Sequence, residues 1–360
     1  MDSARSTTNE PDSGRDFGRS HPIAARVLRQ WRTLTGGSGV RDHSRMTMVA
    51  CSGGPDSSAL AAILALVDPK PVLVHILHDL RESALVSRDR DATKQIADQL
   101  GCRFLERSVA VKDGPGNTEN NARTARYNTL GTIAQQEQIK YIATGHHADD
   151  QLETLLMRLM RGAGPRGLAG IQDARQFNDR TIIRPMLAVT RNEALEICTL
   201  ARLECVHDHT NEDITLSRNA VRHQIVPHIK QIERSVPLKA ATAADSCRST
   251  VQALEELVRN YLWTQGVHSP KSLSWTRSLL RSEPPAALAE LMRQSVGHFT
   301  GSVGLDQITN KSLLAAVDVL KDSSTETREC RLGPIIIHVD ANQVQVSKAC
   351  QASESRMDTT

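Results

Sequence analysis

The feature that most constrains the fold is a glycine turn between a short apolar run and a segment with helical periodicity. Met46 to Cys51 is typical of a buried strand, and Ser57 to Val67 is typical of a helix. Glycines allow positive φ and let backbone N–H groups approach an anion, and the helix N-terminus adds partial positive charge. We therefore expect phosphate binding at the carboxyl edge of a parallel sheet. The residues of the turn are Ser52, Gly53, Gly54, Pro55, Asp56 and Ser57.

A simpler interpretation of the same residues is a bare glycine turn in which Asp56 is the N-cap of the helix. The complete string Ser-Gly-Gly-x-Asp-Ser after a buried strand favours phosphate binding over that alternative. The turn is not a Walker loop, because no Gly-Lys-Ser/Thr follows it.

The order of segments predicts an α/β domain followed by a smaller domain of another kind. From about residue 45 to about residue 207, strands alternate with helices of ten or more residues, which indicates βαβ units and a parallel sheet. A helix from Arg218 to Ile232 follows, and Pro227 is expected to kink or end it. The remainder is expected to be mainly helical, with helices over 238–263, 285–296 and 313–320 and a short β-hairpin within 329–346.

A chain of 360 residues is too long for one ordinary compact domain. We expect a disordered tail over 1–20, a catalytic domain over 21–235, a helical substrate domain over 236–348 and a tail over 349–360.

Composition excludes several classes of function. The net charge of +3 permits a nucleic-acid partner without demanding one, and only 3% aromatic residues disfavours broad base-stacking platforms. Seven scattered cysteines without a Cys-x-x-Cys pair argue against a disulfide framework or a zinc site, so we expect reduced thiols. No segment approaches the roughly 18 apolar residues of a membrane span. The polar N-terminus is unlike a secretory signal, so we expect a cytoplasmic protein.

A second motif, Gly145 to Thr154, follows a short strand and opens a helix. Asp150 and Glu153 are three residues apart and share one side of it, where they would hold Mg²⁺ or polarise a nucleophile. The alternative is that Asp149 and Asp150 only complement the helix dipole. The histidines of the motif are weak signals taken singly. The buried face of the helix is expected to contain Leu152, Leu155, Leu156 and Leu159.

The segment after this helix is basic and rich in glycine. Arg161 and Arg166 are expected to contact RNA phosphates from a flexible loop. An equally good interpretation of Arg158 and Arg161 is that they complement the C-terminus of the helix, with Gly162 ending it.

The glycine turn resembles the pyrophosphate loop of the N-type ATP pyrophosphatases, the PP-loop superfamily. The later segments together resemble the tRNA(Ile)-lysidine synthetase family over residues 46 to 228. The segments that carry this second resemblance are Gly145 to Thr154, Arg161 to Ile171, Asn117 to Tyr127, Arg184 to Arg191, Asp208 to Asp213 and Arg218 to Pro227.

The resemblance implies that O2 of the wobble cytidine of tRNA(Ile) with a CAU anticodon is adenylated by ATP. Free lysine then attacks C2 and gives lysidine, so that AUA is read in place of AUG. ATP and Mg²⁺ are the implied cofactors, with no membrane and no stable protein partner; a homodimer stays open. Asp56 and Asp150 are the implied metal ligands, and together with Glu153 they are the implied catalytic residues. Implied ATP contacts beyond the turn are Arg126 and His146, and implied tRNA contacts are Arg123, Arg161, Arg166, Arg218 and Arg222.

Two departures from the family pattern stand out. The family usually has His-Gly-Leu-Arg after its second strand, whereas this chain has Asp79 in the position of the glycine. Long members also carry a further C-terminal domain, which we do not expect in a chain ending at Thr360.

Three other functions fit the sequence less well. A tRNA thiolase of the same superfamily would rely on catalytic or cluster-binding cysteines, and no Cys-x-x-Cys pair exists. A non-catalytic RNA-binding protein would have lost loop or carboxylate residues, yet Ser52, Asp56, Asp150 and Glu153 are all present. A small-molecule amidating enzyme would need an ammonia-supplying domain, of which the sequence gives no sign.

Overall fold

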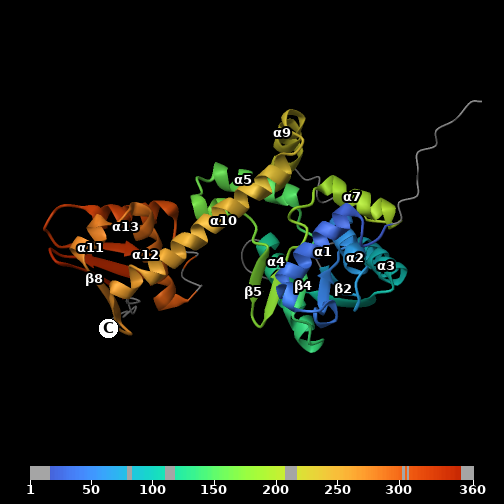
Figure 1. Cartoon of the computed structure of the whole chain (residues 1–360), viewed down its shortest axis with the longest axis horizontal. Coiled ribbons are helices and arrows are strands. Elements are labelled where there is room, and N and C mark those ends of the chain that lie inside the picture. Colours follow the sequence, from blue (N-terminus) through green and yellow to red (C-terminus); the bar gives the residue numbers. More distant parts are fainter. Residues whose placement is uncertain are drawn as a thin grey trace, which may run out of the picture. The chain divides into compact units, whose positions relative to one another are not determined.

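The computed structural model describes residues 17–78, 83–109, 118–206, 217–301, 305 and 308–349. The chain forms two compact units (Figure 1). Unit 1 contains Met1–Arg161 and Gly170–Asp245, and unit 2 contains Gly162–Ala169 and Ser246–Thr360. The division falls inside one long helix, α10 (Val236–Asn260). The domain boundary expected after residue 235 stays a prediction.

Unit 1 is built on a six-stranded sheet in the order β3-β2-β1-β4-β6-β5. All neighbouring strands pair in parallel except the edge strand β5, which forms an antiparallel hairpin with β6. This confirms the expected α/β class with a parallel sheet. The strands are β1 (Thr47–Ala50), β2 (Val72–His78), β3 (Arg103–Val109), β4 (Tyr141–Ala143), β5 (Ala174–Phe177) and β6 (Arg180–Ile183).

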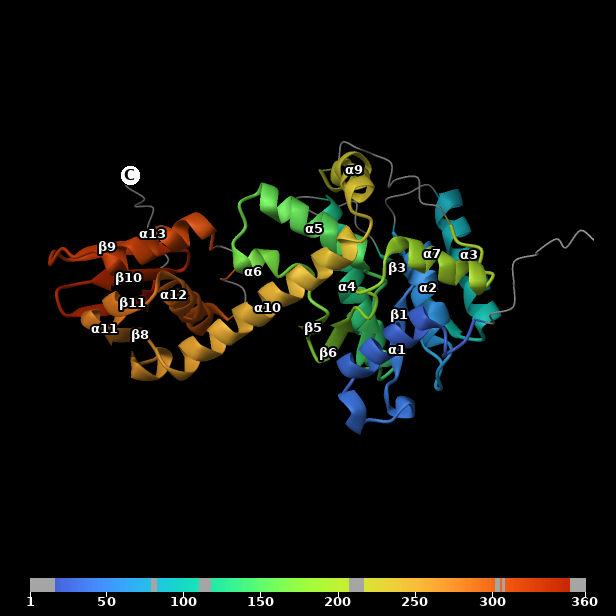
Figure 2. The same cartoon turned by 45° about the horizontal axis from the view of Figure 1, so that its top comes forward.

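Both faces of this sheet are covered, as the short apolar strands require. Alternate residues of β1 belong to different cores: Val49 packs with the helices of one face and Met48 with the other. The first face carries α1 (Pro22–Leu34), α2 (Pro55–Leu64), α3 (Ser83–Leu100) and α7 (Arg191–Leu200), and the second carries α4 (Thr118–Gln136). Figure 2 shows α7 beside α2, and the two helices are in extensive contact.

The segment from Ser217 to Ile232 is helical throughout, but it changes its winding in the middle. α8 (Ser217–Ala220) runs into a π-helical turn (Val221–Ile225), and α9 (Val226–Ile232) follows. Pro227 was expected to kink or end a helix here. The helix does not end at Pro227 but continues to Ile232, and the wider turn ends two residues before the proline, which has no N–H to give to the ladder.

Unit 2 has more sheet than expected. Its five strands pair in the antiparallel order β7-β8-β11-β10-β9, and the expected hairpin forms only the pair β10–β11, with Val339 opposite Val344. The strands are β7 (Val267–His268), β8 (Ser272–Thr276), β9 (Arg328–Leu332), β10 (Ile335–Val339) and β11 (Gln343–Lys348). The helices are most of α10, α11 (Arg277–Ser282), α12 (Pro285–Thr300) and α13 (Asn310–Lys321).

Across the described ranges, no helix combines the length and the apolar character that crossing a membrane requires.

Candidate functional site

The glycine turn joins β1 to α2 at the carboxyl edge of the sheet. Gly53 has φ of +81°, and a Cβ there would lie 3.1 Å from Thr93 Oγ1 and 3.3 Å from the Asp89 carbonyl oxygen. The turn is closed by hydroxyl groups, because Ser57 Oγ accepts from Ser52 N at 3.2 Å and donates to the Gly54 carbonyl oxygen at 3.1 Å. Only glycine satisfies both the backbone angle and the close packing at position 53.

Asp56 is not the N-cap of α2, so the simpler interpretation of the turn is wrong in this respect. The N-cap is Gly54, Pro55 is the first helical residue and Asp56 is the second. No side chain of the described residues caps this helix, so its first N–H groups point to the turn without a side-chain acceptor. That is the arrangement expected of an anion site.

A second glycine brings the two motifs together. Gly145 follows β4, which lies next to β1 in the sheet. A Cβ at Gly145 would be 2.8 Å from the Asp56 carbonyl group and 2.9 Å from Ser57 N. The backbone after β4 therefore touches the first turn of α2, and any side chain at this position would push them apart.

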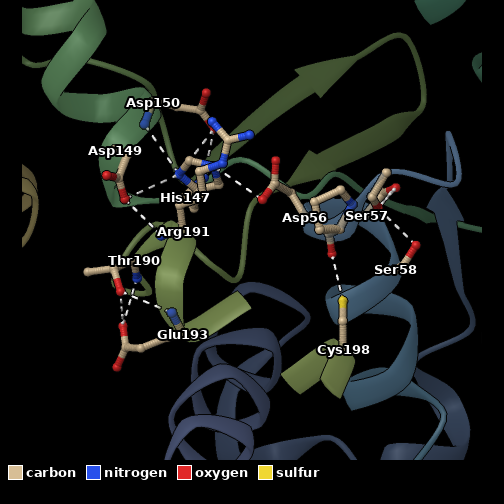
Figure 3. A network of polar contacts seen from close by, with 12 residues as sticks. Asp56, Ser57, Ser58, His147, Asp149, Asp150, Thr190, Arg191, Glu193 and Cys198 are labelled. Atoms are coloured by element: carbon tan, nitrogen blue, oxygen red, sulfur yellow. Dashed lines mark hydrogen bonds and ion pairs between the residues drawn. The ribbon is translucent and has the colours of Figure 1, made fainter. Parts of the chain in front are cut away.

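His147 connects the motifs through its side chain. It is the N-cap of α5 (Ala148–Met160), and its backbone N–H donates to Asp150 Oδ2 at 3.0 Å. Its Nε2 lies 3.4 Å from Asp56 Oδ1, and its Nδ1 lies 3.7 Å from carboxyl oxygens of both Asp149 and Asp150 (Figure 3). One imidazole thus stands between Asp56 on one side and the start of α5 on the other.

The two adjacent histidines have opposite protonation behaviour. Burial lowers the pKa of His147, but the charges of Asp150, Asp56 and Asp149 outweigh it and raise that pKa to about 9. Burial lowers the pKa of His146 to about 3, with help from nearby arginines including Arg184. At neutral pH His147 is therefore an imidazolium and His146 a neutral ring, whose Nδ1 lies 2.8 Å from Thr144 Oγ1.

Asp150 and Glu153 form a cluster with two arginines. Arg218 bonds Asp150 Oδ1 at 2.8 Å and Glu153 Oε2 at 2.9 Å, and Arg222 bonds the two oxygens of Glu153 at 2.6 and 3.0 Å. Glu153 is almost fully buried, with 3% of its side chain exposed. Burial raises the pKa of Asp150, but His147, His146 and Arg218 outweigh it and hold that pKa well below its usual range.

Comparison with known proteins agrees with this geometry. The PP-loop domain family matches residues 24–229. A tRNA(Ile)-lysidine synthase of Nostoc sp. is 32% identical over 271 residues, which cover 70% of this chain and 78% of that protein. The chain belongs to the tRNA(Ile)-lysidine synthase family.

Other relatives of the lysidine synthase family match over shorter shares of their length. The enzyme of Salinispora arenicola is 40% identical over 185 residues, 50% of this chain and 55% of its own. That of Symbiobacterium thermophilum is 33% identical over 296 residues, 77% of this chain and 61% of its own. Among solved structures, a U34-tRNA thiolase of Methanococcus maripaludis matches with a TM-score of 0.50 over 62% of this chain and 79% of its own. At 18% identity this likeness shows the fold alone.

In this member of the lysidine synthase family, the surroundings differ among the arginines that were expected to contact tRNA or ATP. Arg123 and Arg126 both stack over Tyr127, with guanidinium carbons 5.3 and 5.6 Å from the ring centre. Arg218 and Arg222 instead face carboxylates, so each would have to exchange such a contact to bind phosphate. Arg161 ends α5 and is exposed.

Arg166 lies in unit 2 and is already paired. Its guanidinium contacts Glu255 of α10 and Glu290 of α12, the latter at 2.8 Å. The expected face of α5 also needs correction, because Leu152 is buried, Leu155 and Leu156 are half-buried, and Leu159 is 60% exposed. Arg158 lies in the last turn of α5, as its alternative interpretation expected, and Gly162 just after the helix has φ of +70°. Arg158 also donates to the Gly170 carbonyl oxygen at 2.9 Å.

Two residues whose long-range contacts the sequence did not predict hold the site in place. Asp149 is buried, accepts from Arg191 N at 2.8 Å and pairs with Lys230, so it ties α5 to α7 and α9. Gln151 is also buried and makes two bonds to the backbone of Ile171, at 2.6 and 3.1 Å. Their position within the second motif was the available signal, but their partners lie 20 to 81 residues away.

Of the two expected metal ligands, Asp56 and Asp150, only Asp56 fits the binding of a cation. Asp56 is 35% exposed at the phosphate turn, and its Oδ1 lies 3.4 Å from His147 Nε2, so its carboxylate carries fewer contacts than that of Asp150. Both oxygens of Asp150 already accept from His147 N, Arg218 and Arg222. Within the described residues, no three histidine, cysteine, aspartate or glutamate side chains form a metal-binding group.

Some expectations lie outside the described residues. They concern Asp79, Asn117, and the polar loop with Asp208, Thr210, Asn211 and Asp213.

Proposed function

We propose that this chain joins free lysine to C2 of the wobble cytidine of tRNA(Ile) with a CAU anticodon, using ATP and releasing AMP and diphosphate. The product would be lysidine, which changes the codon read from AUG to AUA. The observation that carries this proposal is the contact between the phosphate turn and α5, where Gly145 and His147 bring Asp56 against the Asp150 and Glu153 cluster. Membership of the lysidine synthase family over residues of both units supports it.

The phosphate turn supports a role in holding ATP. Its backbone N–H groups and the uncapped start of α2 supply donors and positive potential for the α-phosphate and the departing diphosphate. Ser52 and Ser57 hydroxyl groups keep the turn closed and lie beside the same donors. Gly53 lets the backbone reach the anion without a side chain in the way.

Of the two expected ligands, Asp56 is the carboxylate better suited to hold Mg²⁺. Mg²⁺ is usually held by one or two carboxylates together with substrate phosphates, and it would neutralise charge on them when bound. Asp150 would have to give up bonds to Arg218 and Arg222 before it could share the ion. We therefore propose that Asp150 orders the arginines and His147, and that Asp56 alone faces the metal.

His146 and the cluster of Arg218 and Arg222 are the groups that would surround the amine of the lysine substrate. His146 stays neutral at neutral pH, so its ring can form a hydrogen bond with a substrate group without adding a charge to the site. Glu153 fixes Arg218 and Arg222 and leaves their remaining N–H groups for phosphate or base. Adenylation also requires that the cytidine leave its stack, and Arg123 and Arg126 beside Tyr127 are suited to bind its backbone.

The decisive assay uses the whole chain with ATP, Mg²⁺, labelled lysine and total tRNA, followed by digestion to nucleosides. A lysine-bearing cytidine is the expected product. Release of AMP with an acceptor other than tRNA, and no label in tRNA, would refute the proposal.

Two variants make this assay sharper. Asp56→Asn should reduce product formation by about 100-fold or more through loss of transition-state charge stabilisation, while its melting temperature stays near that of the parent. Asp98→Asn is the matched control, since Asp98 is an exposed residue of α3 away from the turn. An inactive and unfolded Asp56→Asn protein would instead assign Asp56 a structural role.

A further inference from the structure

Three cysteines meet behind the phosphate turn. Cys51 precedes the turn, and its Sγ lies 3.7 Å from Ser57 Oγ. Cys198 of α7 donates to the Pro55 carbonyl oxygen at 3.2 Å (Figure 3). Cys205 interacts directly with the thiol of Cys198 and with the hydroxyl of Ser58. Cys51 and Cys198 thus touch the first turn of α2, and Cys205 packs against the same core.

The chain after Cys205 is tied to the turn itself. Val206 N donates to the Gly53 carbonyl oxygen at 2.9 Å, and the Val206 side chain lies beside the position that a Cβ of Gly53 would take. Gly53 is the residue whose positive φ shapes the turn. Because Val206 follows Cys205 and is bonded to Gly53, a movement of Cys205 would displace the backbone of the phosphate turn.

The two adjacent thiols differ in access and in reactivity. Cys198 is buried, and its interaction with Cys205 together with burial raises its pKa. Cys205 is half-buried, and its interaction with the Cys198 thiol lowers its pKa. A thiolate that is partly accessible and has a second thiol beside it is the arrangement found in reactive cysteine pairs.

We propose that Cys198 and Cys205 are an oxidisable dithiol, a modification site at which hydrogen peroxide forms a disulfide and weakens ATP binding at the phosphate turn. The thiolate of Cys205 attacks one oxygen of the peroxide and keeps it as a sulfenic acid, while the O–O bond breaks and the other oxygen leaves as hydroxide, which takes up a proton to become water. The sulfur of Cys198 then attacks that sulfenic sulfur, its proton leaves, and a second water is released. Two thiols and one peroxide thus give one disulfide and two waters.

The disulfide would act on the turn from two sides. Cys198 loses the proton that it donates to the Pro55 carbonyl oxygen, and Cys205 is drawn toward α7 together with Val206. Losing a hydrogen bond of this kind corresponds to a weakening of ATP binding by up to about tenfold. This effect rests on the proposed ATP site, whereas formation of the disulfide does not.

The modification is tested on the whole chain treated with one to a few equivalents of hydrogen peroxide. Trypsin cuts after Arg191, Arg202 and Arg218, so Cys198 and Cys205 fall in separate peptides, 192–202 and 203–218. We expect these two peptides to be joined by a disulfide that dithiothreitol breaks. Absence of this link, or a link from Cys205 to Cys51 in its place, would overturn the proposal.

The effect on ATP is measured by titrating reduced and oxidised protein with a fluorescent ATP analogue. Oxidation should weaken binding in the parent and in Cys330→Ser, a control in unit 2, but not in Cys205→Ser or Cys205→Ala. Equal affinity before and after formation of the disulfide would overturn the regulatory part. If reduced protein binds no ATP, the proposed ATP site fails, while the peptide link still decides whether the dithiol exists.

Discussion

At the scale of single residues, Glu153 is a buried carboxylate that pairs with two arginines. Two guanidinium groups bond its carboxylate, which is almost fully buried. Breaking a buried ion pair by neutralising one partner leaves the other charge unsatisfied, and that costs far more than losing an exposed pair.

Glu153→Gln should therefore lower the free energy of unfolding by on the order of 3 kcal/mol. Urea denaturation measures the change. Glu137→Gln is the matched control, because Glu137 pairs with Arg103, whose side chain is 58% exposed. That control should change stability by no more than about 1 kcal/mol, and equal effects of the two substitutions would contradict the assignment of Glu153 as a buried anchor.

The pKa of His147 gives a dependence of stability on pH. Its folded-state pKa is raised to about 9, above the roughly 6.5 of an unfolded histidine. The stabilisation is fully present below about pH 6.5 and is lost as pH rises through about 9. The free energy of unfolding should fall over this window in the parent, and it should fall less steeply in His147→Gln. Parallel curves for the two proteins would rule out an imidazolium at this position.

At the scale of elements, the contact between Gly145 and α2 depends on a missing side chain. Gly145→Ala should reduce activity strongly and lower the melting temperature, because its Cβ would overlap the backbone of Asp56 and Ser57. Gly297→Ala provides the opposite case, since no atom lies within 4 Å of its Cβ position within α12. That change should stabilise the protein by up to about 1 kcal/mol. Thermal melting and the lysine-transfer assay distinguish the two, and normal activity of Gly145→Ala would show that the turn tolerates displacement.

Whether a feature of the site could be predicted from the sequence depends on how far apart its interacting residues lie along the chain. The phosphate turn and the start of α5 are local patterns, and both were predicted from a strand, a glycine turn and a helix. The pairing of Arg218 with Glu153 joins residues 65 positions apart, and that of Arg166 with Glu290 joins residues 124 apart. Periodicity carries no information on such pairs, so the arginines could be named but their ion pairs could not.

The extent of the second sheet was missed for a different reason. β9 reads Arg-Glu-Cys-Arg-Leu, and β8 is a five-residue strand next to a turn, so neither has a long apolar alternation. Both are held by pairing with the hairpin, β9 on β10 and β8 on β11. Strand propensity of this kind depends on neighbours and is weak in an isolated segment.

At the scale of the whole molecule, a net charge of +3 is too small for strong non-specific binding to RNA. The proposed tRNA contacts instead depend on local arginines, and release of counterions should make them sensitive to salt. The affinity for tRNA should fall at least about tenfold between about 50 and 200 mM salt, as measured by filter binding. Arg123→Gln should reduce the slope by about one unit, and a flat response in the parent would argue against tRNA as the substrate.

The place of His147 has a practical consequence for observing this protein at work. One buried imidazole touches Asp56 from the first strand–helix unit and Asp149 and Asp150 from the fourth. Its ring nitrogens are shielded from water, so their protons should exchange slowly and give resolved magnetic resonance signals far from the amide region. Nucleotide binding at the turn and substrate binding at α5 would each shift these signals, and a single labelled side chain would report whether the two halves of the reaction are aligned.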